Sequence, residues 1–222
     1  MSGNASNLTD AGARSDLGDN TKDVAWYIAD EDLPELDSQA YEILVNYSHI
    51  PPDSVRAHVL KKREEAWKIF PFPCIGQMRF LDFSLAKMPS YDKILARLND
   101  SLTPARLLDV GCCFGQDLRR LVADGTPSEN LVGLDVEPQF LSLSYDLFAD
   151  REFFKGQMIA GNIFDESPSS PMASLKKHYR HCPCRFILSP LRLGRSGQSR
   201  HPPSMSDEEC SGFFDTGTSI RI

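Results

Sequence analysis

Short apolar runs separated by helical periodicity occupy residues 105 to 163. The runs at 105–110, 131–135 and 158–163 are almost continuously apolar, and each ends close to an acid or an amide. Such runs predict strands that are buried on both faces of a parallel sheet. Between them, apolar residues recur at helical spacing, at Leu118, Leu121 and Val122 and then from Phe140 to Phe148. The order predicts a βαβαβ unit, the first half of a doubly wound sheet.

The ends of the predicted helices carry the usual signals. Asp124-Gly125 follows the first helical segment, and Pro138 stands where a first-turn proline is tolerated in the second. Further upstream, residues 23–100 are predicted to be helical. There, Pro51 to Ser54 opens a helix with Lys61 to Glu65 on its outer side. The apolar face of that helix is expected to consist of Val55, Val59, Leu60, Trp67 and Phe70.

The turn after the first predicted strand points to a cofactor. Residues 107–115 have the pattern D-x-G-x-x-x-G, with Asp109, Gly111 and Gly115 at its fixed positions. Glycine can adopt positive φ and lets a nucleotide approach the main chain. The dinucleotide pattern G-x-G-x-x-G does not fit, because Cys113 and Gln116 stand where it needs glycines. The pattern favours S-adenosylmethionine, and an ordinary strand–turn–helix without a ligand is the alternative.

Two later positions suit the same cofactor. Asp135 ends the second strand 24 residues after Gly111, close to the spacing of about 20 at which an acid holds a ribose diol. Asn162 follows the third strand and could bind the adenine amino group, with Ile163 covering the ring. The alternatives are a solvated loop acid at Asp135, and simple turn chemistry at Asn162 and Asp165.

The same residues carry a resemblance to a known family. Residues 108–119, including Cys112-Cys113, resemble the class I fungal methyltransferases of meroterpenoid biosynthesis, which act on farnesylated polyketide acids. Residues 72–77, 80–85 and 91–98 resemble the helical N-terminal region of that family, and the resemblance spans roughly residues 25 to 166. It implies S-adenosylmethionine as cofactor and O-methylation, typically of a carboxyl group. The cofactor-binding residues it implies, together with the second glycine of the turn, are Asp109, Gly111, Gly115, Asp135, Val136, Asn162 and Ile163.

The expected chemistry needs no acid–base pair. The methyl group leaves a positively charged sulfonium, and a carboxylate acceptor is already ionised at pH 7. Proximity and alignment supply about 7–11 kcal/mol in such reactions. No residue is therefore assigned a catalytic role.

Four segments are expected: a disordered N-terminus at 1–22, a helical lid or N-terminal region at 23–100, the first half of a cofactor-binding domain at 101–166, and a low-order tail at 167–222. The tail contains six prolines and eleven serines in 56 positions, and only residues 185–188 could form a strand. The expected fold is α/β, a partial Rossmann-like sheet that stops after its third strand. We interpret the chain as cut short by a frameshift, a retained intron or gene decay. The alternative is a functional short form whose sheet is completed by swapping or dimerisation.

The missing fourth strand would leave the edge of residues 105–110 unpaired. Uncovering ~500 Å² of apolar surface costs ~12 kcal/mol, which is comparable with the stability of a whole domain. The sequence therefore predicts that the chain folds poorly.

Charge and composition restrict the partners. The net charge is −7, with −11 in residues 1–166 and +4 in the tail. An acidic body argues against nucleic acid, and no run of 18 apolar residues suggests a membrane span. A polar N-terminus and six cysteines favour reduced thiols in the cytoplasm. The spacing of His178, His181, Cys182 and Cys184 matches no common zinc site, so no metal is expected.

Three functions remain open. The first is an S-adenosylmethionine-dependent O-methyltransferase acting on a small-molecule meroterpenoid acid, with a homodimer as one candidate assembly. The second is an inactive remnant or a binding protein without catalysis. The third, a nucleotide-binding oxidoreductase, is disfavoured by the missing glycines.

Overall fold

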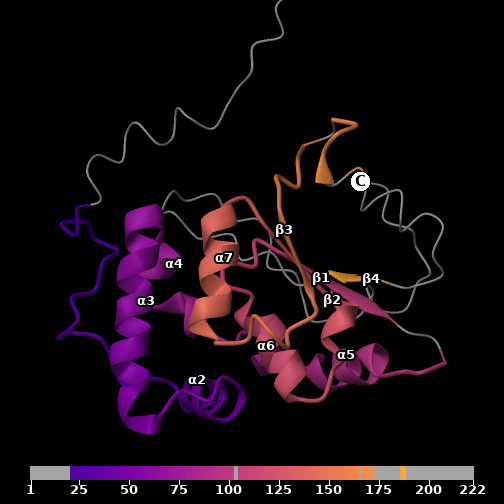
Figure 1. Ribbon diagram of the computed structural model, residues 1–222, viewed down its shortest axis with the longest axis horizontal. Coiled ribbons are helices and arrows are strands. Elements are labelled where there is room, and N and C mark those ends of the chain that lie inside the picture. The colour runs from indigo at the N-terminus through magenta and orange to yellow at the C-terminus, as the bar shows by residue number, and fades with distance from the viewer. Residues whose placement is uncertain (1–20, 103–104, 166, 172, 174–185, 189–222) are drawn as a thin grey trace, which may run out of the picture. The chain divides into compact units, whose positions relative to one another are not determined.

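A parallel sheet of four strands forms the centre of the protein (Figure 1). The computed structural model describes residues 21–102, 105–165, 167–171, 173 and 186–188, the last three by their backbone alone, and all of them belong to one unit spanning residues 1–191. The strands are β1 (Arg106–Val110), β2 (Leu131–Asp135), β3 (Gln157–Ala160) and β4 (Phe186–Leu188), in the order β3-β2-β1-β4. The α/β class and the first three strands agree with the prediction.

The two helices between these strands also lie where the periodicity places them. α6 (Gln116–Ala123) ends at Asp124, and the next residue, Gly125, has a φ of 97°. α7 (Pro138–Leu147) begins with the proline in its first turn, and the Glu137 side chain accepts a hydrogen bond from the Gln139 N–H. Both helices are therefore delimited by local signals that the sequence carries.

The outer edge of β1 is paired, contrary to the expectation. β4 lies parallel to β1, with Arg106 opposite Phe186 and Leu108 opposite Leu188. The exposed N–H and C=O groups of a sheet edge are a template for any extended segment. The three residues of β4, in an otherwise proline- and serine-rich stretch, are enough to pair with this edge. The expectation of an unpaired edge is thus wrong, and it was the basis for predicting poor folding.

The region before the sheet is helical, as predicted. Its elements are α2 (Ser38–Glu42), a π-helix at Ile43–Tyr47, α3 (Val55–Ile69), α4 (Pro73–Gly76), α5 (Tyr91–Leu98) and 3-10 turns at Pro52–Ser54, Arg79–Leu81 and Leu85–Lys87, with one further 3-10 turn, Ser128–Asn130, before β2. α3 packs against α7, and Val55, Val59 and Trp67 of α3 belong to the same buried cluster as Leu143 and Leu147 of α7.

The two faces of the sheet are covered differently. Alternation along β1 and β2 places Leu107 and Leu131 on one face, where they pack with residues of α5 and α6. Val110 and Leu134 are on the opposite face, in a smaller cluster that Ile159 and Ile163 join. By the same alternation, Asp109 and Asp135 project from the α6 side of the sheet.

One residue of α3 contradicts its predicted side. Arg63 was expected outside with its charged neighbours, yet it is 1% exposed. It lies four residues after Val59 and four before Trp67, so it falls on the buried face. Its guanidinium donates to the carbonyls of Ile28, Ile75 and Gly76 and pairs with Asp30 at 2.7 Å. These partners compensate the loss of hydration, which periodicity alone does not reveal.

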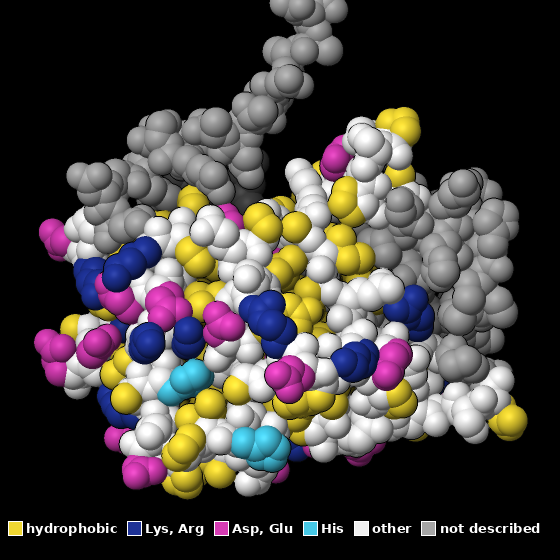
Figure 2. Space-filling view, viewed as in Figure 1, with side chains coloured by type: hydrophobic (Ala, Val, Ile, Leu, Met, Phe, Trp, Pro, Cys, Tyr) yellow, Lys and Arg dark blue, Asp and Glu magenta, His cyan; other side chains and the backbone are white. Residues whose placement is uncertain are grey.

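The surface has mixed charge on the face shown in Figure 2, where Lys and Arg side chains lie among Asp and Glu. No helix in the described part of the chain is both long and apolar enough to cross a membrane.

Candidate functional site

The turn between β1 and α6 has three residues in the left-handed region. Gly111, Cys113 and Gly115 have φ values of 68°, 54° and 61°. The N–H groups of Gly111 and Cys112 both donate to the Leu134 carbonyl at the end of β2, at 2.8 and 3.1 Å. The turn is therefore held against the carboxyl end of the neighbouring strand, which is where ligands bind in open α/β sheets.

The two glycines of the turn have different surroundings. A Cβ at Gly111 would meet no atom within 4 Å, and this residue is exposed. A Cβ at Gly115 would lie 2.8 Å from Arg119 Nη1 and 3.0 Å from Met158 Cε. Gly111 thus leaves open space beside the backbone, whereas Gly115 is required for packing.

Asp135 is joined directly to this turn. Its Oδ2 accepts from the Cys113 N–H at 2.7 Å, and its Oδ1 accepts from the Glu137 N–H at 3.0 Å. The side chain is nearly buried, and burial raises the pKa of this carboxyl above its ordinary value against the opposing effect of these N–H donors. Each carboxylate oxygen has a second lone pair, so the acid can still accept from a ligand hydroxyl.

The third predicted strand brings its loop to the same edge of the sheet. The Gly161 N–H donates to the Asp135 carbonyl at 2.8 Å, which places Asn162 directly beyond β2. The Asn162 side-chain oxygen accepts from the Phe164 N–H, and Asp165 accepts from the Ser167 N–H, which lowers the pKa of Asp165. Both contacts are the turn chemistry weighed as the alternative. The Asn162 oxygen, which was expected to bind the adenine amino group, already accepts one hydrogen bond in the turn, and the amide N–H₂ remains as a donor.

The remaining predicted residues differ in exposure. Val136 is 54% exposed beside Asp135, while Ile163 is partly buried against the smaller apolar cluster that contains Val110 and Leu134. Asp109 is 6% exposed and projects from the same face as Asp135. The seven predicted residues thus come from three consecutive strand ends of one sheet.

Two of the turn residues are cysteines, and a third cysteine lies in α4. Cys112 and Cys113 are buried free thiols, and Cys74 of α4 is a partly buried one. The Cys113 thiol interacts with that of Cys74, which lowers the pKa of Cys74 and raises that of Cys113, while burial raises that of Cys112. Cys113 therefore occupies the place of an expected glycine and faces the N-terminal helices.

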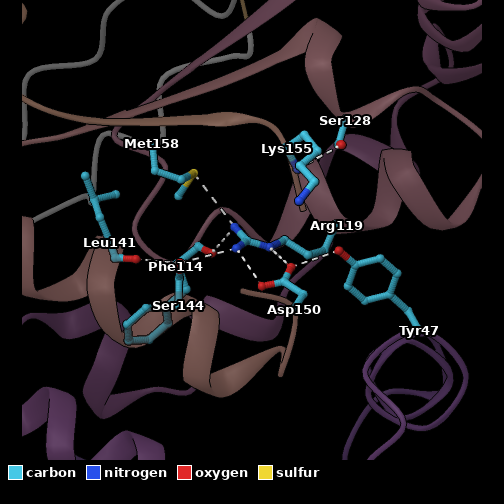
Figure 3. Close-up of polar contacts among 9 residues, drawn as sticks. All are labelled: Tyr47, Phe114, Arg119, Ser128, Leu141, Ser144, Asp150, Lys155 and Met158. Carbon is cyan, nitrogen blue, oxygen red and sulfur yellow. Dashed lines mark hydrogen bonds and ion pairs between the residues drawn. The ribbon is translucent and has the colours of Figure 1, made fainter. Parts of the chain in front are cut away.

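Three residues that the sequence did not single out support this turn. Arg119 of α6 and Asp150 after α7 form an ion pair with both side chains fully buried, and Tyr47 donates to the same acid (Figure 3). Arg119 also donates to the Phe114 carbonyl inside the turn, at 3.2 Å. In the sequence, the one sign of a buried Arg119 was its place next to the apolar positions of an amphipathic helix.

No group of acidic, histidine and cysteine side chains among the described residues could hold a metal ion. The four residues considered for zinc, from 178 to 184, lie outside the described part.

Comparison with known proteins places these features in a family context. Residues 26–81 match the family model of the meroterpenoid methyltransferase N-terminal domain. The O-methyltransferase atr3 of Stereocaulon alpinum is 42% identical over 147 residues, which cover 66% of this chain and 41% of the relative. The methyltransferase adrK of Penicillium roqueforti is 44% identical over 61% of this chain and 48% of its own length. The Asnovolin E/Chermesin D methyltransferase nvfJ of Aspergillus novofumigatus is 44% identical over 60% and 47%.

These matches confirm the resemblance drawn from the glycine turn and its neighbours. The chain spans a little under half the length of these curated relatives. No solved structure matches it.

Proposed function

We propose that the chain is an S-adenosylmethionine-dependent O-methyltransferase of meroterpenoid biosynthesis. It is similar to fungal methyltransferases over about two thirds of its length, and its residues 26–81 match the meroterpenoid methyltransferase N-terminal domain. One observation carries the proposal beyond sequence similarity. The hydrogen bond between Asp135 and the Cys113 N–H joins the ribose-binding candidate to the glycine turn, on the edge where nucleotides bind.

The residues present fit this cofactor. Beside Gly111 there is open space that a Cβ would fill, and main chain with positive φ is accessible there. Asp135 retains lone pairs for the ribose diol, and charged acceptors make strong hydrogen bonds with hydroxyl groups. Val136 and Ile163 would contact the adenine ring, and Asn162 would hydrogen-bond its edge with the part of its amide not used in the turn. Gly115 contributes by keeping the turn and α6 packed.

The reaction asks little covalent chemistry of the protein. The bound cofactor supplies a methyl group on a positively charged sulfur. The chain's residues orient that group, exclude water and align the acceptor, which is worth about 7–11 kcal/mol in well-ordered sites. Asp109, a buried acid on the same sheet face as Asp135, favours the cationic end of the ligand.

The acceptor, the assembly and the location are part of the same proposal. The acceptor is a carboxyl group of a small meroterpenoid acid, since the family resemblance points there. The proposed location is the cytoplasm, and a homodimer is the candidate assembly. The division into four segments at residues 22, 100 and 166 also stays a prediction.

Calorimetric titration of S-adenosylmethionine into the 222-residue chain tests the proposal. We expect saturable binding to the unaltered protein and at least about tenfold weaker binding to Asp135→Ala, because a hydrogen bond to a charged group contributes about 1.5–3 kcal/mol. Asp146→Ala is the matched control, since this acid lies on α7 and pairs with Arg151 on the surface. Its affinity should equal that of the unaltered chain.

The outcomes separate the competing functions. No heat from a chain that melts cooperatively would refute cofactor binding and support the inactive remnant. Equal affinity for all three proteins would remove Asp135 from the site. Preference for a nicotinamide dinucleotide would support an oxidoreductase, although the relatives named above are methyltransferases.

A further inference from the structure

The N-terminal helices and the glycine turn are connected through one buried acid, Asp150. Arg119 Nε donates to Asp150 Oδ2 at 2.7 Å and Arg119 Nη2 to Oδ1 at 3.2 Å. The Tyr47 hydroxyl, at the end of the π-helix, donates to the same Oδ2 at 2.8 Å (Figure 3). Tyr47 is separated from Asp150 by 103 residues, so this contact is purely tertiary.

Arg119 reaches the turn from the other side. Its Nη1 donates to the Phe114 carbonyl at 3.2 Å and lies 3.8 Å from the Met158 sulfur of β3. The guanidinium also stacks over the ring of Phe154 at 4.1 Å. One side chain thus contacts the turn, the strand beyond β2 and the acid that Tyr47 holds.

A second set of the same three residue types provides a natural comparison. Arg120 Nε and Nη2 donate to the two oxygens of Asp124, and the Tyr91 hydroxyl donates to Asp124 Oδ2 at 2.6 Å. The connectivity is the same as that of Arg119, Asp150 and Tyr47. This second set, however, lies at the far end of α6 and is partly exposed, with side-chain exposures of 18% for Arg120 and 20% for Asp124.

We propose that Tyr47, Asp150 and Arg119 form a positioning triad, which holds the glycine turn in its binding shape and makes that shape depend on the docked N-terminal helices. Tyr91, Asp124 and Arg120 then secure α5 to the far end of α6 without acting on the turn. The role toward a cofactor rests on the proposed function, whereas the ordering of the turn does not.

The chemistry of the buried set favours this role. Burial, followed by the Asp150 carboxylate, raises the pKa of Tyr47, so its hydroxyl remains a donor across the physiological range. A guanidinium is planar and binds a carboxylate and a carbonyl with separate N–H groups at once, which an ammonium cannot reproduce. Arg119 and Asp150 are fully buried, whereas Tyr47 is partly exposed. Because the ion pair itself is closed to water, we expect the loss of the Tyr47 hydroxyl to reach the turn through Asp150 and Arg119.

Two pairs of variants of the full chain test the proposal. Tyr47→Phe and Tyr91→Phe each remove one hydroxyl from equivalent hydrogen bonds. Arg119→Lys and Arg120→Lys each keep the charge and lose the fork. Amide hydrogen exchange is measured without ligand for peptides covering residues 111–115, and S-adenosylmethionine affinity is measured by calorimetry.

We expect Tyr47→Phe to speed exchange in the turn by about tenfold, the effect of losing one hydrogen bond to a charged group. The affinity for S-adenosylmethionine should fall by a similar factor. Arg119→Lys should give the larger change in both measurements. Tyr91→Phe and Arg120→Lys should leave exchange and affinity within about twofold of the unaltered chain, even where their melting temperatures fall.

Equal effects of the two tyrosine variants on the turn would overturn the proposal. So would a Tyr47→Phe protein that melts earlier but keeps the exchange of residues 111–115 unchanged. If the unaltered chain binds no S-adenosylmethionine, the proposed function fails and hydrogen exchange alone decides the positioning role. If Arg119→Lys does not fold, Tyr47→Phe still decides it, because that change deletes a single oxygen.

Discussion

At the scale of single residues, the two glycines of the turn carry different constraints. Both have positive φ, which costs a residue with a Cβ about 1–2 kcal/mol. Gly111 has free space around a Cβ, while Gly115 lies against Arg119 and Met158. The same residue type therefore leaves open space at one position, where we propose that a ligand approaches, and allows internal packing at the other.

This difference predicts that an alanine at Gly111 mainly weakens cofactor binding, whereas an alanine at Gly115 mainly lowers stability. Gly111→Ala should lower the free energy of unfolding by only about 1 kcal/mol, yet abolish S-adenosylmethionine binding by filling the open space. Gly115→Ala should cost about 2–4 kcal/mol, because the backbone strain adds to overpacking against Arg119. Urea unfolding and calorimetric titration measure the two quantities.

Gly125→Ala is the control for backbone strain alone. Gly125 has a φ of 97° with no atom within 4 Å of a Cβ, and it lies after the end of α6. Its stability loss should match that of Gly111→Ala, with cofactor binding retained. Unimpaired binding by Gly111→Ala would show that the ligand does not approach this part of the turn.

At the scale of elements, α3 depends on a buried cation as much as on its apolar face. Arg63 joins α3 to three carbonyls of the segments around Ile28 and Gly76. It also stacks over the Tyr27 ring at 4.1 Å. The carbonyls of Ile75 and Gly76 also accept from the N–H groups of Met78 and Ile28, so Arg63 supplies a second donor to each of them.

We therefore expect Arg63→Met to destabilise the protein by about 3 kcal/mol, because the hydrogen bonds of a buried charged group and its ion pair with Asp30 are lost together. The matched control is Arg56→Met on the same helix, whose hydrogen bonds to the carbonyls of Asp30 and Pro34 are exposed. That change should cost no more than about 0.5 kcal/mol. Urea midpoints that are equal for the two variants would contradict a structural role for the buried cation.

At the scale of the whole molecule, the N-terminal helices and the sheet share their cores. Phe114 of the glycine turn packs edge-on against Phe80, with ring centroids 5.1 Å apart. Leu85, Ile94 and Leu98 lie in one cluster with Leu107 of β1 and Leu131 of β2. Neither part can lose its partner without uncovering apolar surface, so the two should unfold together.

Thermal melting can test this coupling with the chain's own chromophores. Both tryptophans, Trp26 and Trp67, lie in the N-terminal region, so their fluorescence reports on that region. Far-ultraviolet circular dichroism reports on all helices and strands. We expect coincident midpoints; two separated transitions would show that the helices and the sheet are independent units.

The positions of the strands and of the helices between them were determined by the sequence alone. Continuous apolar runs, helical spacing and the signals at Gly125 and Pro138 are local, and local patterns survive in the fold because each element must bury its own apolar side chains. The glycine turn and Asp135 were found in the same way, since parallel strands bring their carboxyl ends to one edge. The family resemblance followed from those residues.

Tertiary structure decided which polar groups meet. Arg63 finds Asp30 at a separation of 33 residues, and Arg119 finds Asp150 at 31. A charge becomes buried only where distant partners compensate its lost hydration, and no local pattern encodes those partners. The pairing of β4 with β1 also depends on tertiary structure, because a three-residue segment becomes a strand only when a free sheet edge offers it hydrogen-bond partners. The sequence thus specified the elements and the edge at which we propose that the cofactor binds, and the fold specified the contacts that hold that edge in shape.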